Sequence, residues 1–189
     1  MQQIQPYSWQ GANTNLADRS PLFCPLSQRT EVAIALGSNL GDPSAILTAA
    51  LEHLSKTPGL TLHYHSHFYQ TVAVGPPQPD YLNACALFST ILSPQQLLQT
   101  LLKIEQQFGR VRRERWGARL LDLDLLLFGG QILLEPNLEV PHPRIAERAF
   151  VLVPLAEIAP HWIEPVSGKA IAELVKTVDC SGVRRVDAP

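Results

Sequence analysis

The segment RLLDLDLLLF at residues 119–128 is an apolar run interrupted by only two charges after its first residue, Asp122 and Asp124. Its leucines, its length and the Gly129-Gly130 pair behind it predict a strand over residues 120–128 that ends in a turn. Side chains two residues apart on a strand point to the same side, so both carboxylates should emerge together, about 7 Å apart. This strand therefore carries two charges on one face of a sheet.

Strands and helices alternate on both sides of this segment. The expected elements are a strand at 31–36, a helix between Asp42-Pro43 and Pro58-Gly59, strands at 60–69 and 81–92, a helix from Ser93-Pro94 to Gly109, the strand 120–128, a return segment at 131–134, and short helices at 147–158 and 169–178. Caps, prolines and apolar periodicity set these bounds. The order β-α-β-β-α-β favours the α/β (α+β) class, as a ferredoxin-like sandwich with a mainly antiparallel sheet and helices on one face.

Within the strand 60–69, alternation predicts Leu62 and Tyr64 on one side and the three histidines with Tyr69 on the other, wet side. His63, His65 and His67 could bind a metal from that face. We interpret them instead as a solvent face, because no Cys, Asp or Glu completes a ligand set.

Composition limits the class of protein. The 189 residues are 46% hydrophobic with a net charge of −2, which fits one globular domain and argues against a general nucleic-acid binder. The three cysteines, Cys24, Cys85 and Cys180, have no disulfide or metal spacing. Residues 1–30 show neither periodicity nor a secretory pattern, and no run could cross a bilayer. We therefore expect an extension at 1–30, a domain at 31–179, a tail at 180–189 and a cytoplasmic location.

Two aspartates in an apolar strand need a nearby positive charge to compensate their own negative charges. Oxygen ligands suit Mg²⁺, which commonly combines one or two carboxylates with phosphate oxygens and water. The pair Asp122 and Asp124 is therefore a candidate magnesium site. The alternative is that both aspartates pair with arginines and only support the fold.

A cluster of arginines precedes the two aspartates, at positions 110, 112, 113, 115 and 119. Guanidinium groups bind phosphate oxygens at two points and stay charged. Trp116 in the same segment offers a flat face for a heterocycle. A solvated charged loop with Glu114 as a local partner is the alternative, but beside a metal site the cluster favours phosphoryl transfer.

Other motifs say less about chemistry. Residues 37–42, GSNLGD, lack the lysine and the spacing of a Walker A loop and are interpreted as a turn that lets the backbone approach a ligand or neighbour. His142, in VPHPR, is undecided between a turn residue and a phosphate contact.

The sequence also resembles a known family. The segment RWGARLLDLDLL (115–126) is similar to the signature of 6-hydroxymethyl-7,8-dihydropterin pyrophosphokinases. Further matching blocks follow in order: ALGSNLGD (35–42), FYQT (68–71), PDYLNA (79–84), IEQQFGR (104–110), VPHPR (140–144) and RAFVLVPLAEIAP (148–160). The resemblance implies a ferredoxin-like enzyme that transfers diphosphate from ATP to a hydroxymethyl-dihydropterin, with two Mg²⁺ ions, in tetrahydrofolate biosynthesis.

The resemblance also implies roles for individual residues. Asp122 and Asp124 match the metal ligands, while Arg110 and Arg119 match arginines that hold the triphosphate. The residues that match pterin contacts are Thr71, Ala73, Val74, Tyr81, Asn83, Trp116 and Phe150. Those that match nucleotide contacts are Glu105, Arg110, Arg112, Trp116, Arg119, Leu125, His142 and Arg148.

The expected reaction is attack by the pterin hydroxymethyl oxygen on the β-phosphorus of ATP, which releases AMP. The expected partners are ATP and the pterin, for a monomer with no nucleic acid and no membrane. Two rival hypotheses remain. A metal-dependent nuclease would use the same residue types but predicts a basic surface. A non-catalytic nucleotide-binding module would bind ATP without forming AMP.

Overall fold

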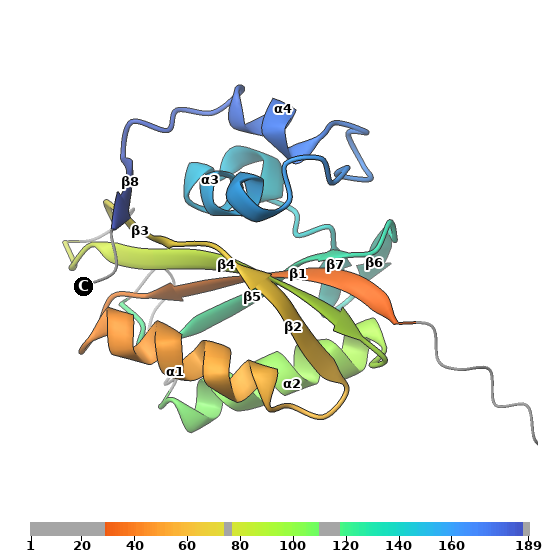
Figure 1. Ribbon diagram of the computed structural model, residues 1–189, viewed down its shortest axis with the longest axis horizontal. Coiled ribbons are helices and arrows are strands. Elements are labelled where there is room, and N and C mark those ends of the chain that lie inside the picture. The colour runs from red at the N-terminus through yellow and green to blue at the C-terminus, as the bar shows by residue number, and fades with distance from the viewer. Residues whose placement is uncertain (1–28, 74–76, 110–117, 187–189) are drawn as a thin grey trace, which may run out of the picture.

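The computed structural model describes residues 29–73, 77–109 and 118–186. Its main sheet has the strand order β5-β1-β4-β3-β8, with β2 also paired to β4, and every pairing is antiparallel. These strands are β1 (Thr30–Ser38), β2 (Leu60–His65), β3 (Phe68–Thr71), β4 (Tyr81–Thr90), β5 (Asp122–Phe128) and β8 (Val183–Val186). The predicted antiparallel α/β sandwich is confirmed (Figure 1).

Strand β1 lies inside the sheet between β4 and β5, and its residues from Val32 to Ser38 are buried apart from the half-buried Ala35. It pairs with β4 over its whole length, from Thr30 opposite Thr90 to Ser38 opposite Leu82. On its other side it pairs with β5, with a register shift at Ala33 and Ile34. The strand therefore carries one buried face toward each helical layer.

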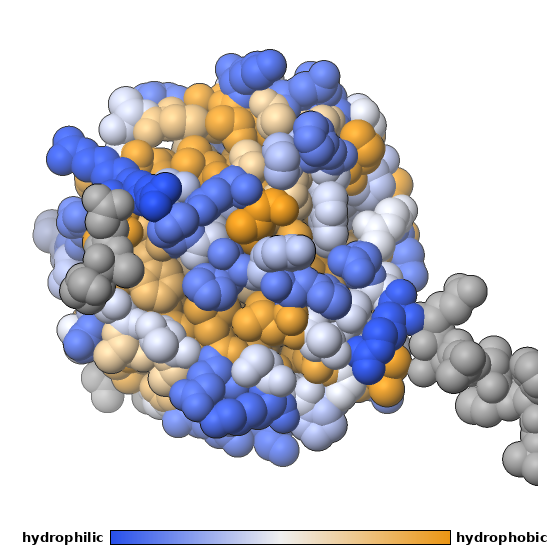
Figure 2. Space-filling view, viewed as in Figure 1, coloured by the Kyte–Doolittle hydropathy of each residue, from blue (hydrophilic) through white to orange (hydrophobic). Residues whose placement is uncertain are grey.

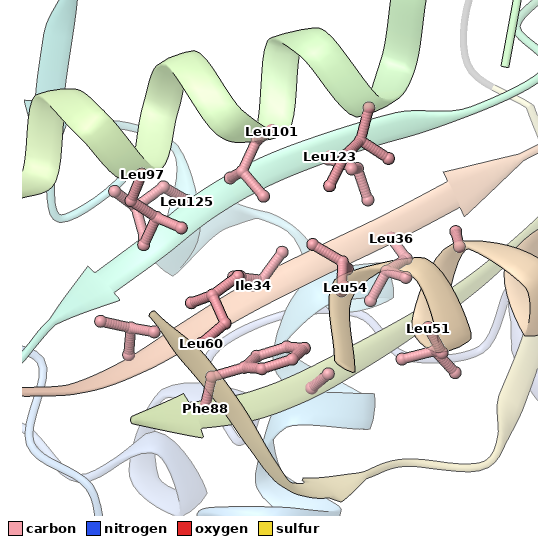
Figure 3. Packing of buried hydrophobic residues seen from close by; sticks show 14 of the residues in the cluster. Ile34, Leu36, Leu51, Leu54, Leu60, Phe88, Leu97, Leu101, Leu123 and Leu125 are labelled. Carbon is pink, nitrogen blue, oxygen red and sulfur yellow. The ribbon is translucent and has the colours of Figure 1, made fainter. Parts of the chain in front are cut away.

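Helices α1 (Pro43–Ser55) and α2 (Pro94–Gln107) cover one face of the sheet (Figure 1). Both begin as predicted: Asp42 accepts a hydrogen bond from the Ala45 N–H, and Ser93 forms a capping box with Gln96. Figure 3 shows Leu97 and Leu101 of α2 directed toward β5. The layer closes into one core, which also includes Ile34, Leu36, Leu54, Phe88, Leu123 and Leu125.

Helices α3 (Ala149–Ile158) and α4 (Ile171–Val175) lie on the opposite face of the sheet (Figure 1). The prediction of helices on one face only was therefore wrong. The reason is that β1, β4 and β5 are apolar on both sides, so a second core forms around Ala33, Cys85, Leu127 and Leu152. The 3₁₀ turn η1 (Ile145–Glu147) precedes α3, which explains the expected start of that helix at 147.

The predicted single strand at 60–69 is also wrong, because β2 and β3 are separated at Ser66 and His67. Ser66 is buried, donates its N–H to the Cys85 carbonyl and accepts the Cys85 N–H on its hydroxyl. Tyr69 is buried whereas His67 is exposed, although both side chains bond to Glu157 of α3. The face that was expected to be wet is therefore partly covered by α3.

Two features at the end of the chain were not predicted. A separate hairpin joins β6 (Leu133–Glu135) to β7 (Leu138–Val140). Val183–Val186, expected to belong to a tail, instead form β8 and pair with β3. In the face that Figure 2 presents, hydrophobic residues reach the surface at separate places among hydrophilic ones.

Candidate active site

One cavity of about 450 Å³ gathers most of the residues that the sequence singled out. It lies on the α3 side of the sheet, where β1 and β5 run beside the start of β4. Its lining comprises Ala35, Leu36, Gly37, Thr71, Val72, Tyr81, Asn83, Ala84, Arg119, Asp122, Asp124, His142, Pro143, Arg144, Arg148, Phe150 and Val151. Residues from six separate stretches of the chain therefore meet here.

The two aspartates lie on the same face of β5, as their spacing predicts. Asp122 pairs across the ladder with Gly37 and Asp124 with Ala35, and all four residues line the cavity. The side chains of Asp122 and Asp124 are 26% and 34% exposed, so the carboxylates are neither walled off nor fully solvated. A ligand in the cavity could therefore reach both.

Arg119 forms an ion pair with Asp122, with its Nη1 atom 2.5 Å from Oδ1. Burial alone would lower the pKa of Arg119, but the Asp122 carboxylate more than offsets this and raises it. Burial also raises the pKa of Tyr81 at the same wall of the cavity, against the opposing effect of Arg119. Arg119 is thus a permanent cation beside the first aspartate.

Arg148 forms the corresponding pair with Asp124, at 3.2 Å, and its guanidinium lies 5.6 Å from the ring centre of Phe150. His142 lies beside this pair, 3.7 Å from the Asp124 carboxylate, and its Nδ1 accepts the Arg144 N–H. Burial lowers the pKa of His142, and the charge of Arg148 acts in the same direction. This wall of the cavity combines an acid, a cation and an aromatic face.

Both aspartates therefore pair with arginines, as the structural alternative proposed. Pairing alone does not account for their position, however. An ion pair that only supported the fold would not need to face a cavity, whereas the ion pairs of Asp122 and Asp124 both do. Such carboxylates and arginines can exchange partners when a polyphosphate and its cation enter.

The part of the cavity lined by Thr71, Tyr81, Asn83 and Phe150, called the ring end below, suits a planar heterocycle. Asn83 is 7% exposed and its Nδ2 donates to the Thr71 hydroxyl at 2.7 Å, which leaves its Oδ1 directed toward Gly37. A fixed amide acceptor can recognise an N–H group on a ring. Tyr81 and Phe150 supply aromatic faces nearby.

Several predicted site residues fall elsewhere. Arg110, Arg112, Trp116 and Val74 lie outside the described residues. Ala73 is half-buried and does not line the cavity.

Two further predicted residues are buried in the fold. Glu105 is fully buried and accepts the Leu123 N–H on Oε1 at 2.8 Å, and Leu125 is packed in the core of the α1 and α2 layer. These two residues therefore act on β5 from behind the cavity.

Sequence reasoning missed Arg144 and Asn39. Arg144 lines the cavity beside His142, but its motif drew attention only to the histidine. Asn39 was interpreted as part of a turn, yet it is 2% exposed and its side chain bonds to two other segments. An asparagine in a sequence does not indicate such a role until the structure shows that its side chain is buried.

The histidines at 63, 65 and 67 do not gather around a common point. His63 lies 3.9 Å from Glu31, His65 Nδ1 contacts the Ser66 carbonyl, and His67 bonds to Glu157 and Arg185. Across the described ranges, no set of three or more His, Cys, Asp and Glu side chains could enclose a metal.

The cavity nevertheless fits magnesium of the kind the sequence suggested. Mg²⁺ needs only one or two carboxylates when a substrate phosphate and water complete its shell, and Asp122 and Asp124 present oxygen ligands on one face.

None of the described helices has the length and hydropathy that a bilayer crossing demands.

Paired acids, paired arginines and a ring-binding end define the site of a transferase for a phosphorylated donor and a planar acceptor. Comparison with known proteins agrees. The family described as 7,8-dihydro-6-hydroxymethylpterin-pyrophosphokinase (HPPK) matches residues 33–160. The chain belongs to this family, and the expected resemblance and enzyme class are confirmed.

Individual relatives are similar over most of their length. A 2-amino-4-hydroxy-6-hydroxymethyldihydropteridine pyrophosphokinase from Synechocystis is 49% identical over 168 residues, which is 89% of this chain and 86% of that protein. One of the same name from Methylorubrum extorquens is 43% identical and covers 84% and 99%.

Among solved structures, Plasmodium falciparum HPPK-DHPS superposes with a TM-score of 0.66 at 15% identity, which shows the shared fold. It matches 82% of this chain but only 45% of that longer one.

Proposed function

We propose that this chain transfers diphosphate from ATP to the hydroxymethyl group of 6-hydroxymethyl-7,8-dihydropterin, a step of tetrahydrofolate biosynthesis. The products are AMP and the pterin diphosphate. Family membership supports the reaction. The observation that carries it is one cavity lined both by Asp122, Asp124 and Arg119 and by Asn83 with the aromatic rings of Tyr81 and Phe150.

Asp122 and Asp124 are the proposed ligands of Mg²⁺, two ions in number. When bound, this cation would supply charge neutralisation of the polyphosphate and make the acceptor hydroxyl more acidic. Binding by the carboxylates would release the partner arginines toward phosphate oxygens, to which guanidinium groups bond at two points.

The chain's own residues act mainly by position and charge. The acceptor oxygen forms a bond to the β-phosphorus while the bond from that phosphorus to the α-phosphate oxygen breaks, so AMP leaves. Arg119 faces the charge that develops on the leaving group, and removing such a donor typically costs about 3–4 kcal/mol of barrier. Arg110 is proposed to assist it. The motif around Asp122 and Asp124 offers no obvious general base, so we expect positioning and metal activation to dominate.

The ring end of the cavity binds the pterin. Asn83 Oδ1 accepts a ring N–H, with Thr71 fixing the amide, and Phe150 and Tyr81 contact the ring faces. Ala73, Val74 and Trp116 are proposed to complete this subsite.

The nucleotide half of the site is proposed from the remaining family positions. Arg148 and His142 are proposed to contact the nucleotide, because both line the cavity beside Asp124. Arg112 remains a further candidate, whereas Glu105 and Leu125, buried behind the cavity, are proposed to support it through β5. Residues 110–117, which hold the remaining matched arginine and tryptophan positions, lie outside the described residues.

Incubation with ATP, Mg²⁺ and hydroxymethyl-dihydropterin tests the function. The expected result is AMP and pterin diphosphate in equal amounts, with no AMP when the pterin is omitted. ADP as the main product would replace the reaction by single phosphoryl transfer. ATP binding without turnover would indicate a nucleotide-binding module, and degradation of nucleic acid with Mg²⁺ would indicate a nuclease.

We further propose that the protein works as a cytoplasmic monomer, with residues 31–179 and the strand β8 (Val183–Val186) as the catalytic domain, a separate extension at 1–30, and no nucleic acid or membrane as partner. One cavity within one chain supports the monomer, since it brings acids, arginines and the ring end together without a second copy. Sedimentation at the concentrations used for activity tests this point.

A further inference from the structure

Asn39, at the end of β1, uses its whole side chain to join two segments that flank the cavity. Its Oδ1 accepts the Arg119 N–H at 2.7 Å, and its own backbone N–H donates to the Arg119 carbonyl at 3.0 Å. Its Nδ2 donates to Gln78 Oε1 at 3.0 Å and to the Pro79 carbonyl at 2.9 Å. Asn39 therefore makes four hydrogen bonds. Its partners Gln78, Pro79 and Arg119 lie 39, 40 and 80 positions further along the chain.

The two segments that Asn39 joins lead to two different groups of residues that line the cavity. Arg119 lies three residues before Asp122 and forms its ion pair. Pro79 lies two residues before Tyr81, the first residue of β4, whose Asn83 faces the ring end. If either segment shifted where it bonds to Asn39, a side chain that lines the cavity only a few residues away would shift with it.

We propose that Asn39 is a positioning residue that fixes Arg119, and with it Asp122, relative to the ring end of the cavity. It does not line the cavity, so it acts through Arg119 on one side and the segment 78–81 on the other. This inference rests on the proposed function, because it concerns the alignment of an acceptor held at one end with a phosphate held at the other. Misplacement by about 1 Å can cost on the order of a hundredfold in rate.

The chemistry of the amide explains why asparagine suits this position. One atom must accept from a backbone N–H, and the other must donate to two oxygens at once, which only a carboxamide does at this length. Because Asn39 is 2% exposed, water cannot replace a lost partner, and an unmatched group would displace one of the segments.

Two substitutions separate the two connections. Asn39→Ala removes all three side-chain bonds and keeps only the backbone bond to the Arg119 carbonyl, so we expect kcat to fall by about a hundredfold and the KM for the pterin to rise. Asn39→Asp keeps the acceptor for Arg119 but places a second oxygen against Gln78 and Pro79. We therefore expect Asn39→Asp to raise the pterin KM about tenfold while kcat changes much less, since only the ring-end segment is released.

The Asn39→Asp variant also allows a rescue. The introduced carboxyl can donate to Pro79 only when protonated, and burial near two oxygens raises its pKa. Pterin affinity of this variant, measured by direct binding and relative to wild type, should therefore recover as the pH is lowered to mildly acidic values. A residue with a merely structural role would not give this recovery.

Asn137→Asp, at an exposed position between β6 and β7, serves as the matched control. The proposal fails if Asn39→Asp keeps wild-type KM and kcat, if its pterin binding shows no recovery with pH, or if both Asn39 variants are unfolded by circular dichroism. Failure of the proposed function would instead appear in the wild-type protein, as absence of AMP formation, so the two failures are distinguishable.

Discussion

The Asn83 Oδ1 atom lies 3.0 Å from the position that a Cβ atom would occupy on Gly37. Real Cβ contacts are rarely this short, and the next nearest atom, on the Tyr81 ring, is 3.9 Å away. Gly37 therefore leaves room for an amide that the Thr71 hydroxyl fixes from the other side. The absence of a side chain at one residue thus sets the acceptor geometry at another.

Gly37→Ala is expected to weaken pterin binding, because the new methyl group must push the Asn83 amide from its place. Loss of one well-placed hydrogen bond costs about 1–3 kcal/mol, or about ten- to a hundredfold in affinity. Titration with the pterin measures this, and ATP affinity should stay near wild type. An unchanged pterin affinity would mean that Asn83 does not contact the ring.

Asp124→Asn is expected to lower kcat at least about a hundredfold, since a neutral amide binds the cation poorly and leaves phosphate charge less neutralised. The side chain is 34% exposed, so thermal stability should change little. Asp179→Asn, at an exposed position after α4, is the control. Full activity of Asp124→Asn at all magnesium concentrations would rule out its role as a ligand.

Arg119→Lys should lower kcat much more than it lowers ATP affinity. A lysine keeps the charge beside Asp122 but loses the planar two-point contact, which matters most as charge develops on the leaving group. Single-turnover kinetics with a separate nucleotide binding measurement distinguishes the two. Equal losses in both would make Arg119 a ground-state contact.

Glu105→Leu is expected to destabilise the fold by about 1–3 kcal/mol, because the buried Leu123 N–H loses its acceptor. Glu105→Gln keeps an oxygen for that bond and should retain most of the stability. Urea denaturation of both variants measures the difference. If Glu105→Leu left stability intact but weakened ATP binding, the residue would act on the nucleotide instead of on β5.

Stability should fall as the pH rises from about 10 to about 12. Burial, together with the hydrogen bond to Glu157, raises the pKa of Tyr69 to about 12, above the ordinary value of 10 in the unfolded chain. A raised folded pKa gives stability that is present below pH 10 and is lost through this window. Tyr69→Phe should flatten this part of the denaturation profile, whereas Tyr64→Phe, on an exposed side chain, should not.

Much of the fold follows from local patterns. Asp42-Pro43 and Ser93-Pro94 start helices as caps should, and the alternation around Asp122 and Asp124 places both carboxylates on one face. The break at Ser66 could not be foreseen, because it depends on a hydrogen bond to Cys85 that only the assembled sheet provides. Long-range pairing of β3 with β8 was hidden for the same reason.

The site was predictable in its residue types but not in its pairings. Asp124 could have pointed to solvent or to metal, and its partner Arg148 is 24 residues away. Asn39 carried no signal of its own beyond a turn motif, since its role arises from contacts with Arg119 and Pro79. Contacts between distant segments follow from the tertiary arrangement.

The edge strand β8 has a practical consequence for anyone who shortens this protein. Its four residues, Val183–Val186, cover the outer edge of β3, the strand that carries Thr71 into the cavity. A chain that ends before Val183 would expose that edge to pairing with other chains and promote aggregation. It would also loosen β3, which carries Thr71 at the ring end. The resulting loss of activity could then be mistaken for a catalytic defect.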